Sequence, residues 1–451
     1  MSDISLEDIA SLAKRRGFIY QGSDIYGGLA GTWDYGPLGV ALKRNLVNAW
    51  WKFFVDSRDD MYGIESAILM NPKVWVASGH VATFNDPLIE DVKTKKRYRL
   101  DHLLEDNGID NAASMSMEQM VQTIQEKGLK SPDGNDLANP AAFNLLFKTS
   151  IGAVENEASS VYLRGETAQG MFTNYKNIVD SFYPDLPFGI AQVGKAFRNE
   201  ISPRDFIFRV REFEIAEFEY FIHPESWQEE FEKWRALMHD WFVSIGLPAE
   251  KIHELEVPEA DRAHYSKRTM DFEFAYPFGT KEIAGLAYRT DFDLQNHQRD
   301  SGKSMDYRPK AGGEPFVPHV IEPTFGVDRH VLAVLANAYT VDEMNGDQRV
   351  YLKLPKQLAP IKAAVSPLLK NKPELATKAK EVYDMLKKEL GAVMWDDNGN
   401  IGKRYRRQDE IGTPACIVID FQTLEDNTVT VRDRDSAEQQ RIAVDKLLAS
   451  L

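Results

Sequence analysis

A strand–loop–strand pattern between residues 188 and 222 constrains the fold more than any other feature of this sequence. Residues 188–197 have the pattern of one strand and 199–205 that of a polar connection. Residues 206–222 have the pattern of a second strand, rich in aromatic side chains. This arrangement predicts a hairpin, and so a sheet with antiparallel neighbours.

Carboxylates interleave with the aromatic residues of the second strand, at Glu212, Glu214, Glu217 and Glu219. A half-buried strand rarely carries so many, because burying an ion without a partner costs several kcal/mol. The pattern indicates either a solvated sheet face with cross-strand pairs or a carboxylate surface that binds Mg²⁺ or an ammonium group. The residues alone leave both interpretations open.

Two arginines flank this hairpin in positions that suit anions. Arg198 ends the first strand, where its planar guanidinium can reach the same surface and contact a carboxylate or a phosphate. Arg329 follows Gly326 at the predicted start of an apolar helix, 330–339, and free amides at a helix start favour an anion. Taken alone, Asp328 is also consistent with a helix cap and Arg329 with a surface residue.

Nucleotide-binding loops of the common kinds are missing from the sequence. Gly189 to Ala196 comes within one residue of a phosphate loop, but Ala196 has no hydroxyl for Mg²⁺ and the segment lies in a strand. No GxGxxG segment occurs, and the nine histidines show no metal-ligand spacing. If the protein binds a nucleotide, the binding must therefore use another chemistry.

Two long amphipathic helices are predicted, at 38–54 and 225–247, from apolar residues at helical spacing. The first contains the pair Trp50 and Trp51. These aromatics are suited equally to a core and to a subunit interface, because both environments are rich in such residues. Residues 101–140 are polar and acidic, which predicts an insertion on the surface of the larger domain.

The last hundred residues differ from the rest in pattern and in charge. Residues 348–451 hold 18 basic and 15 acidic side chains, whereas residues 1–347 hold 36 and 54. Alternating strands and helices predict a small α/β domain with a mostly parallel sheet, beginning near 341–348. The basic balance suggests a polyanionic partner, unless it reflects chance variation. The expected strands are 350–354, 392–395, 415–421 and 428–431, and the expected helices are 375–390 and 436–448.

Composition points to a cytoplasmic protein without a membrane span. No apolar run approaches the roughly 18 residues that a spanning helix needs, and the first 18 residues lack the apolar segment of a signal peptide. The single cysteine, Cys416, excludes a disulfide framework and a cysteine-built zinc site.

Several of these segments resemble one enzyme class. Arg198 and Arg329, with carboxylates between them, resemble motifs 2 and 3 of the class II aminoacyl-tRNA synthetases, and the helix after Gly36-Pro37 resembles motif 1. That class binds ATP on an antiparallel sheet. The chain is most similar to its dimeric (α2) glycyl-tRNA synthetases, through blocks at 11–18, 26–28, 33–39, 143–148, 166–170 and 405–414.

The resemblance implies an α+β catalytic domain built on an antiparallel sheet over residues 1–345, with an insertion at about 86–160. A small α/β anticodon-binding domain would follow over 346–451. The implied enzyme is an ATP-dependent glycine–tRNA ligase. The glycine carboxylate attacks the α-phosphate of ATP to give glycyl-adenylate and pyrophosphate, and the terminal ribose hydroxyl of tRNA(Gly) then takes the glycine.

The implied partners are glycine, ATP, tRNA(Gly) and a second copy of the chain, joined through the region from Gly36-Pro37 to Phe54. Mg²⁺ would accompany ATP, with Glu282 as a possible ligand. Zinc is not expected, because Asp91-Val-Lys-Thr-Lys95 has no cysteines where some members carry them. Two alternatives stay open: a catalytically inactive nucleic-acid-binding accessory subunit of this fold, and a synthetase for another small amino acid.

Site residues carried over by motif form three groups. The catalytic residues would be Arg198, Glu200 and Arg329. The glycine-binding residues would be Arg99, Glu166, Phe213, Glu214, Ile215, Ala216, Glu217, Glu322, Pro323, Thr324, Phe325 and Gly326. The ATP-binding residues would be Arg198, Asn199, Glu200, Phe208, Arg209, Val210, Arg211, Glu212, Phe213, Glu282, Ile283, Gly326, Val327, Asp328 and Arg329.

Within these groups the glycine ammonium would meet Glu166, Glu217 and Glu322. Two departures from the family pattern affect that site. Gly165 stands where the family often has proline, and Thr324 stands where it usually has serine. Glycine loosens the backbone beside a predicted ligand. The extra methyl group of threonine is expected to narrow the glycine pocket.

Overall fold

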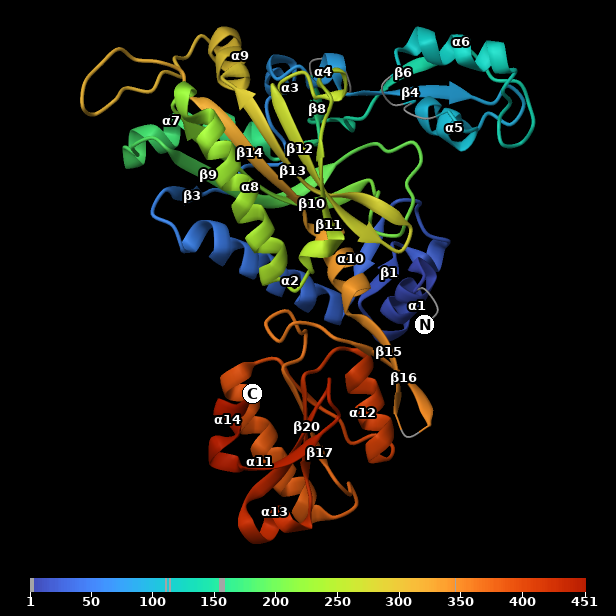
Figure 1. The fold of residues 1–451 in the computed structure, drawn as a ribbon, viewed down its shortest axis with the longest axis vertical. Coiled ribbons are helices and arrows are strands. Elements are labelled where there is room, and N and C mark those ends of the chain that lie inside the picture. Colours follow the sequence, from blue (N-terminus) through green and yellow to red (C-terminus); the bar gives the residue numbers. More distant parts are fainter. Residues whose placement is uncertain (1–3, 110–111, 113–114, 154–158, 345) are drawn as a thin grey trace.

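A seven-stranded sheet forms the centre of the larger domain in the computed structural model, which describes every residue except 1–3, 110–111, 113–114, 154–158 and 345 (Figure 1). The strand order is β11-β12-β13-β14-β10-β9-β3. All neighbours are antiparallel except β3 and β9, which confirms the antiparallel sheet expected from the sequence. The strands are β3 (Met61–Gly63), β9 (Phe188–Phe197), β10 (Glu212–Ile222), β11 (Ile252–Glu256), β12 (Arg268–Tyr276), β13 (Gly279–Thr290) and β14 (His319–Gly326).

Helices cover both faces of this sheet. On one face, α2 (Pro37–Trp51), α8 (Trp227–Ser244) and α10 (Val327–Ala338) bury a core of aromatic side chains that includes Trp50, Phe218, Trp241 and Phe325. On the other face, α7 (Ala168–Phe182) and α9 (Phe292–Ser301) pack a smaller core that includes Phe221. Side chains alternate along a strand, so adjacent residues of β10 and β14 point to opposite faces.

The larger domain also contains several shorter helices and strands outside the insertion. They are α1 (Leu6–Arg16), β1 (Ile19–Gln21), β2 (Trp33–Tyr35), α3 (Pro72–Ala77), α4 (His80–Thr83), β7 (Lys148–Ser150) and β8 (Ser160–Tyr162). Strands β1 and β2 form a hairpin directly before α2.

The predicted strand at 206–222 begins later than expected, at Glu212. Asp205 and Phe206 have φ values of 60° and 58°, which reverse the chain, and Arg204 bridges to Arg209 across the turn. The backbone amide of Arg211 then donates to the carbonyl of Gly31 rather than to a sheet neighbour. These contacts turn 199–211 into a loop that folds back over the end of the sheet.

The predicted helix at 38–54 is α2, which continues as a wider π turn over Lys52–Asp56. Trp50 is buried in the main core, with 2 % of its surface exposed. The Trp51 ring lies where a side chain on Gly63 would otherwise stand. Both tryptophans therefore pack within this chain.

The predicted insertion contains a small module with its own core, which projects from the sheet domain (Figure 1). Strands β4 (Asn85–Glu90), β5 (Arg97–Arg99) and β6 (Ala141–Asn144) pair in the order β5-β4-β6, beside α5 (Leu100–Asp106) and α6 (Met117–Lys127). Leu100, Leu103 and Met120 are buried between them. Parts of the predicted insertion lie outside the described residues.

A hairpin of β15 (Tyr339–Met344) and β16 (Asp347–Leu352) links the sheet domain to the C-terminal domain. The C-terminal sheet has the order β18-β17-β19-β20-β21. Its strands are β17 (Ala363–Pro367), β18 (Val393–Trp395), β19 (Ala415–Ile419), β20 (Thr428–Asp433) and β21 (Gln439–Ala443). Its helices are α11 (Pro373–Leu390), α12 (Ile401–Glu410), α13 (Phe421–Asp426) and α14 (Leu447–Ser450).

Three sequence predictions for this domain were wrong. The sheet is mixed rather than mostly parallel, because β20 and β21 run antiparallel to their neighbours. Within the expected helix at 436–448, residues 439–443 form strand β21, because an Asp433-capped turn reverses the chain and lays them along β20, and helical backbone begins only at Val444. The expected strand at 350–354 belongs to the linking hairpin. Across the described residues no helix is long and apolar enough to cross a membrane.

Candidate active site

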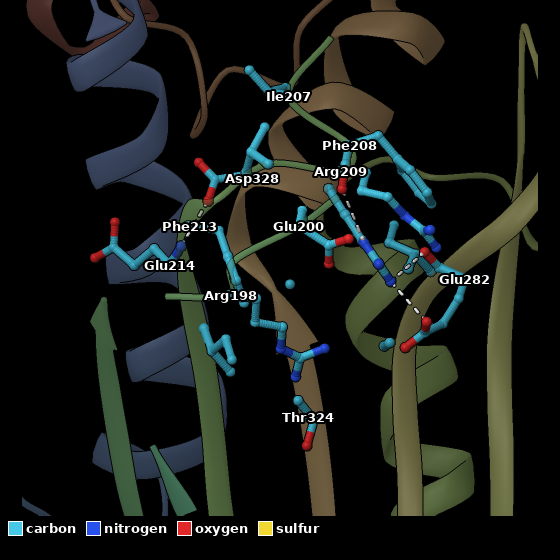
Figure 2. Close-up of a pocket in the computed structure, with 16 residues that line it drawn as sticks. Arg198, Glu200, Ile207, Phe208, Arg209, Phe213, Glu214, Glu282, Thr324 and Asp328 are labelled. Carbon is cyan, nitrogen blue, oxygen red and sulfur yellow. Dashed lines mark hydrogen bonds and ion pairs between the residues drawn. The ribbon is translucent and has the colours of Figure 1, made fainter. Parts of the chain in front are cut away.

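A pocket opens where β10, β13 and β14 meet the loop 199–211 and the first turn of α10 (Figure 2). It contains the three predicted catalytic residues, Arg198, Glu200 and Arg329. The full lining is Arg198, Glu200, Ile207, Phe208, Arg209, Val210, Phe213, Glu214, Ile215, Glu282, Ile283, Ala284, Thr324, Gly326, Asp328 and Arg329. The sequence-distant segments that carry these residues are therefore neighbours in space.

Arg329 is a fixed and compensated cation of this pocket. Its Nη1 lies 2.8 Å from Oε2 of Glu282 and donates to the Glu282 carbonyl at 3.2 Å. Its guanidinium lies over the ring of Phe208, 4.5 Å from the centroid. The side chain is thus held against the pocket wall, where a planar guanidinium can stack on a ring or bind a phosphate.

Arg198 and Arg209 differ from Arg329, because neither lies within ion-pair distance of a carboxylate among the described residues. Arg198 donates from Nε to the Gly165 carbonyl at 3.3 Å and lies between the rings of Phe84 and Phe213, at 5.2 and 5.4 Å. Arg209 donates from Nη1 to Nε2 of His102 at 3.1 Å. Two uncompensated guanidinium groups in one pocket suit a polyanion.

Gly165 has a packing reason in this structure. A Cβ atom there would lie 3.1 Å from the Phe84 ring and 3.2 Å from Leu146. Phe84 is one of the two rings beside Arg198. The glycine therefore leaves room for the ring that helps to hold this arginine.

Below the pocket, on the same face of the sheet, the predicted glycine ligands Glu166, Glu217 and Glu322 come together with a residue that the sequence analysis missed. Arg289 is fully buried and contacts three carboxylates. Its Nε and Nη2 donate to Asp293 at 2.8 and 2.9 Å, Nη1 pairs with Glu322, and Nη2 lies 3.8 Å from Glu166. The only sequence signal was an arginine at a strand end, four residues before an aspartate.

Hydroxyl and amide donors complete this carboxylate cluster, which consists of Glu166, Glu217, Glu219, Asp293 and Glu322. The amide and hydroxyl of Thr167 both donate to Glu217, the amide at 2.8 Å. The Thr324 hydroxyl lies 3.3 Å from Glu217 and 2.9 Å from Glu322. His80 lies 3.2 Å from Glu166.

The cluster holds more carboxyl groups than cations. Its ion pairs, over the part of the chain that the structure describes, come from Arg289 and His80. Burial, with Glu322 and Glu166 nearby, raises the pKa of Glu217 to about 8. Burial and Glu322 also raise the pKa of Glu219 well above its usual value, and its two oxygens have no partner within the described ranges. Such an excess of buried carboxyl groups suits a small cationic ligand.

Alternation along the strands removes several predicted residues from the site. Ala216, Phe325 and Val327 lie in the main core, on the opposite face, and Pro323 shares the strand position of that face. Glu214 lines the pocket with other atoms, but its carboxylate points away from the pocket (Figure 2) and pairs with Lys43 of α2 at 2.7 Å. Contiguous motifs therefore include residues that serve the core.

Other predicted residues hold the surrounding backbone, and of these Asp328 alone also lines the pocket. Arg211 donates to the carbonyls of Glu200 and Ala30, at 3.1 and 2.8 Å. The amide of Asn199 donates to the Leu145 carbonyl, and Glu212 pairs with Lys195 at 3.0 Å. Asp328 accepts from the Glu214 amide at 2.7 Å and from Tyr35, which fixes the start of α10.

Arg99, predicted to bind the glycine substrate, does not lie with the carboxylate cluster. It belongs to the insertion module, 2.9 Å from Asp86 and 2.5 Å from Asp101. Both of its charge partners come from this module, so its guanidinium is already compensated. No group of three or more histidine, cysteine or acidic side chains arranged for a metal occurs among the described residues, and the absence of zinc remains a prediction.

Comparisons with known proteins give a consistent picture. Residues 147–338 match the family described as tRNA synthetase class II core domain (G, H, P, S and T), and residues 362–451 match the family described as anticodon binding domain. A glycine–tRNA ligase of Caldanaerobacter subterraneus is 47 % identical, with 98 % of this chain and 97 % of the relative covered. One from Deinococcus radiodurans is 46 % identical, with 99 % and 98 % covered.

A solved structure shares the fold at low sequence identity. Giardia lamblia prolyl-tRNA synthetase in complex with prolyl-adenylate is 15 % identical and has a TM-score of 0.66. The likeness covers 98 % of this chain and 77 % of that one.

Proposed function

Because this chain belongs to the glycine–tRNA ligases, a family of class II aminoacyl-tRNA synthetases, we propose that the sheet pocket binds ATP and that the carboxylate cluster beneath it binds glycine. Glycine is a zwitterion and ATP a polyanion. The cluster is rich in carboxyl groups, and the pocket contains two guanidinium groups without carboxylate partners. This juxtaposition of opposite charges carries the proposal.

Arg198 is the residue that joins the two parts. Figure 2 shows its guanidinium directed toward Thr324, whose hydroxyl contacts the carboxylate cluster. From there it would hold the glycine carboxylate against the α-phosphate. In the first step a carboxylate oxygen attacks the α-phosphorus, the bond to pyrophosphate breaks, and glycyl-adenylate forms. Arg198 and Arg329 would stabilise the charge on the phosphate in the transition state.

The second step transfers glycine to tRNA(Gly). The terminal ribose hydroxyl attacks the activated carbonyl, and AMP leaves. The domain over 346–451 would bind the anticodon. Its basic balance and the exposed Lys403 and Arg406 of α12 support this assignment. ATP and tRNA are cytoplasmic, and we place the reaction in that compartment.

Mg²⁺ fits beside the triphosphate. Glu200 and Glu282 both line the pocket, and Oε2 of Glu200 is buried without a hydrogen-bond partner among the described residues. Carboxylate oxygens of this kind are the ligands that Mg²⁺ prefers together with phosphates. These two residues would hold the ion, which would neutralise phosphate charge.

We also propose a homodimer that forms through the region from Gly36-Pro37 to Phe54, with further contacts from the loop that precedes it. The apolar side of α2 is already buried within this chain. Ile25 and Tyr26, in the hairpin loop that precedes α2, are 89 % and 88 % exposed and would pack against the second copy. Replacing both with Glu should convert a dimer to a monomer in sedimentation; a parent protein that is itself monomeric contradicts the proposal.

The experiment that tests the function is ATP–pyrophosphate exchange with each of the twenty amino acids, followed by charging of tRNA(Gly). Exchange with glycine alone is expected, because a small pocket rejects every larger amino acid by sterics. Exchange with another small amino acid instead would indicate a different synthetase. No exchange with any amino acid would indicate an inactive binding subunit.

A further inference from the structure

Arg209 of the proposed ATP pocket is held by a residue from outside the sheet domain. Its side chain makes one hydrogen bond within the described part of the chain, from Nη1 to Nε2 of His102 at 3.1 Å. Arginine has only donors, so the imidazole nitrogen must accept. His102 belongs to α5 of the insertion module, and none of the sequence motifs assigns His102 to the site.

The backbone of His102 is fixed by a buried polar corner. Arg99 binds Asp101 through Nε at 3.0 Å and Nη2 at 2.5 Å, and reaches Asp86 of β4 at 2.9 Å. The amide of His102 donates to the same Asp101 at 2.9 Å. Arg99 therefore has a structural role in this network, which holds the start of α5 against β4 and β5.

His102 is neutral at working pH. Burial lowers its pKa to about 4, and Arg99, Arg204 and Arg209 add to that shift, whereas Asp101 opposes it. The remaining proton then lies on Nδ1, and Nε2 is free to accept from Arg209.

A neutral acceptor affects an arginine differently from a carboxylate. Arg329 is oriented by Glu282, and that ion pair offsets part of its charge. The imidazole of His102 orients Arg209 without adding a negative charge, so the positive charge of Arg209 remains available to an anion in the pocket.

We propose that His102 is a positioning residue for ATP, which directs Arg209 into the pocket while leaving its charge for the triphosphate. The insertion module is thereby part of the nucleotide site. This inference rests on the proposed function, since it takes the pocket to bind ATP.

Three substitutions separate orientation from charge. His102→Ala removes the acceptor, and the KM for ATP should rise about threefold to tenfold, the effect of one lost hydrogen bond. His102→Gln supplies a neutral acceptor and should stay within about twofold of the parent. His102→Glu, of nearly the same shape as Gln, adds a charge and should raise the KM for ATP at least as much as Ala. The KM for glycine should change less than about twofold throughout.

The readouts are exchange kinetics at varied ATP and varied glycine, and calorimetric titration of each protein with ATP. His253→Ala, at an exposed histidine of β11, is the matched control. A parental KM for ATP in the Ala variant, or equal values for Gln and Glu, overturns the inference. If Ala fails to fold, the Gln–Glu pair still decides. A parent that binds no ATP and shows no glycine-dependent exchange contradicts the proposed function itself, as distinct from the role of His102.

Discussion

At the scale of one residue, Glu217 is a carboxyl group whose burial lowers stability near neutral pH and which we propose to bind the glycine ammonium. It is buried beside Glu322 and Glu166, and these surroundings raise its pKa to about 8. The empty protein therefore keeps a proton on Glu217 at neutral pH. An ammonium group favours the ionised carboxylate, so glycine bound at the proposed site would release this proton.

The glycine affinity should follow this titration. Below the pKa of Glu217, each unit of falling pH should raise the KM for glycine by up to about tenfold, and above it the KM should level off. The KM for ATP should not follow the same curve. Exchange assays at saturating ATP, from about pH 6.5 to about pH 8.5, measure this. A glycine KM that is independent of pH removes Glu217 from the ammonium site.

Glu217→Gln should change stability and activity in opposite directions. The raised pKa means that the folded protein binds a proton that the unfolded chain has lost, so stability falls as pH rises from about 4.3 to about 8. Glutamine removes this loss, and the variant should melt no lower than the parent at pH near 8. Glycine-dependent exchange should drop at least about tenfold. A variant that is both inactive and unstable at that pH indicates a merely structural role.

At the scale of secondary-structure elements, strands β9 and β10 show what the sequence can and cannot predict. The pattern at 188–222 predicts two paired strands, and both are present as β9 and β10. The start of β10 was missed, because the chain reverses at Asp205 and Phe206 and the Arg211 amide then donates to the carbonyl of Gly31, which is far away in sequence. Family motifs identify Glu217 and Glu322, but Arg289 acquires its role only from folding, through partners on another strand and a helix.

Because side chains alternate along β14, substitutions at two neighbouring positions should have different effects. Thr324 faces the carboxylate cluster, and its neighbour Phe325 faces the core. Thr324→Gly should admit alanine far better than the parent, because a steric wall of this size discriminates by about 1–3 kcal/mol, while Thr324→Ser should behave almost like the parent.

Phe325→Leu is the control on the same strand. It should lower the free energy of unfolding by about 1–3 kcal/mol without admitting alanine. Alanine-dependent exchange and thermal unfolding of the three variants are the measurements. If Thr324→Gly still rejects alanine, another wall enforces the specificity.

At the scale of the whole molecule, the contacts between the two domains determine where the chain can be truncated without loss of core residues. Leu352, at the end of the linking hairpin, and Leu354 and Leu358, just after it, pack in the core of the larger domain. Asn45 of α2 donates to the carbonyls of Leu358 and Ala359, at 3.2 and 3.1 Å. The change in charge near residue 348 therefore precedes the end of the larger packed unit.

A chain that ends after Pro360 should keep glycine-dependent exchange and lose most charging of tRNA(Gly). The reason is that the residues proposed to form the adenylate all precede the cut, whereas the proposed anticodon-binding surface follows it. A chain that ends at residue 347 loses three core leucines and should unfold at lower temperature. Undiminished charging by the longer chain contradicts the assignment of the C-terminal domain.

Arg198 provides the most direct test, because it alone joins the proposed glycine and ATP parts of the site. The measurement is glycine-dependent ATP–pyrophosphate exchange by Arg198→Ala, beside Arg299→Ala at an exposed arginine of α9. Loss of about 2 kcal/mol of transition-state stabilisation, roughly thirtyfold in rate, is predicted for Arg198→Ala, and a parental rate for the control. Parental exchange in Arg198→Ala would contradict the account of a single site formed by the pocket and the carboxylate cluster.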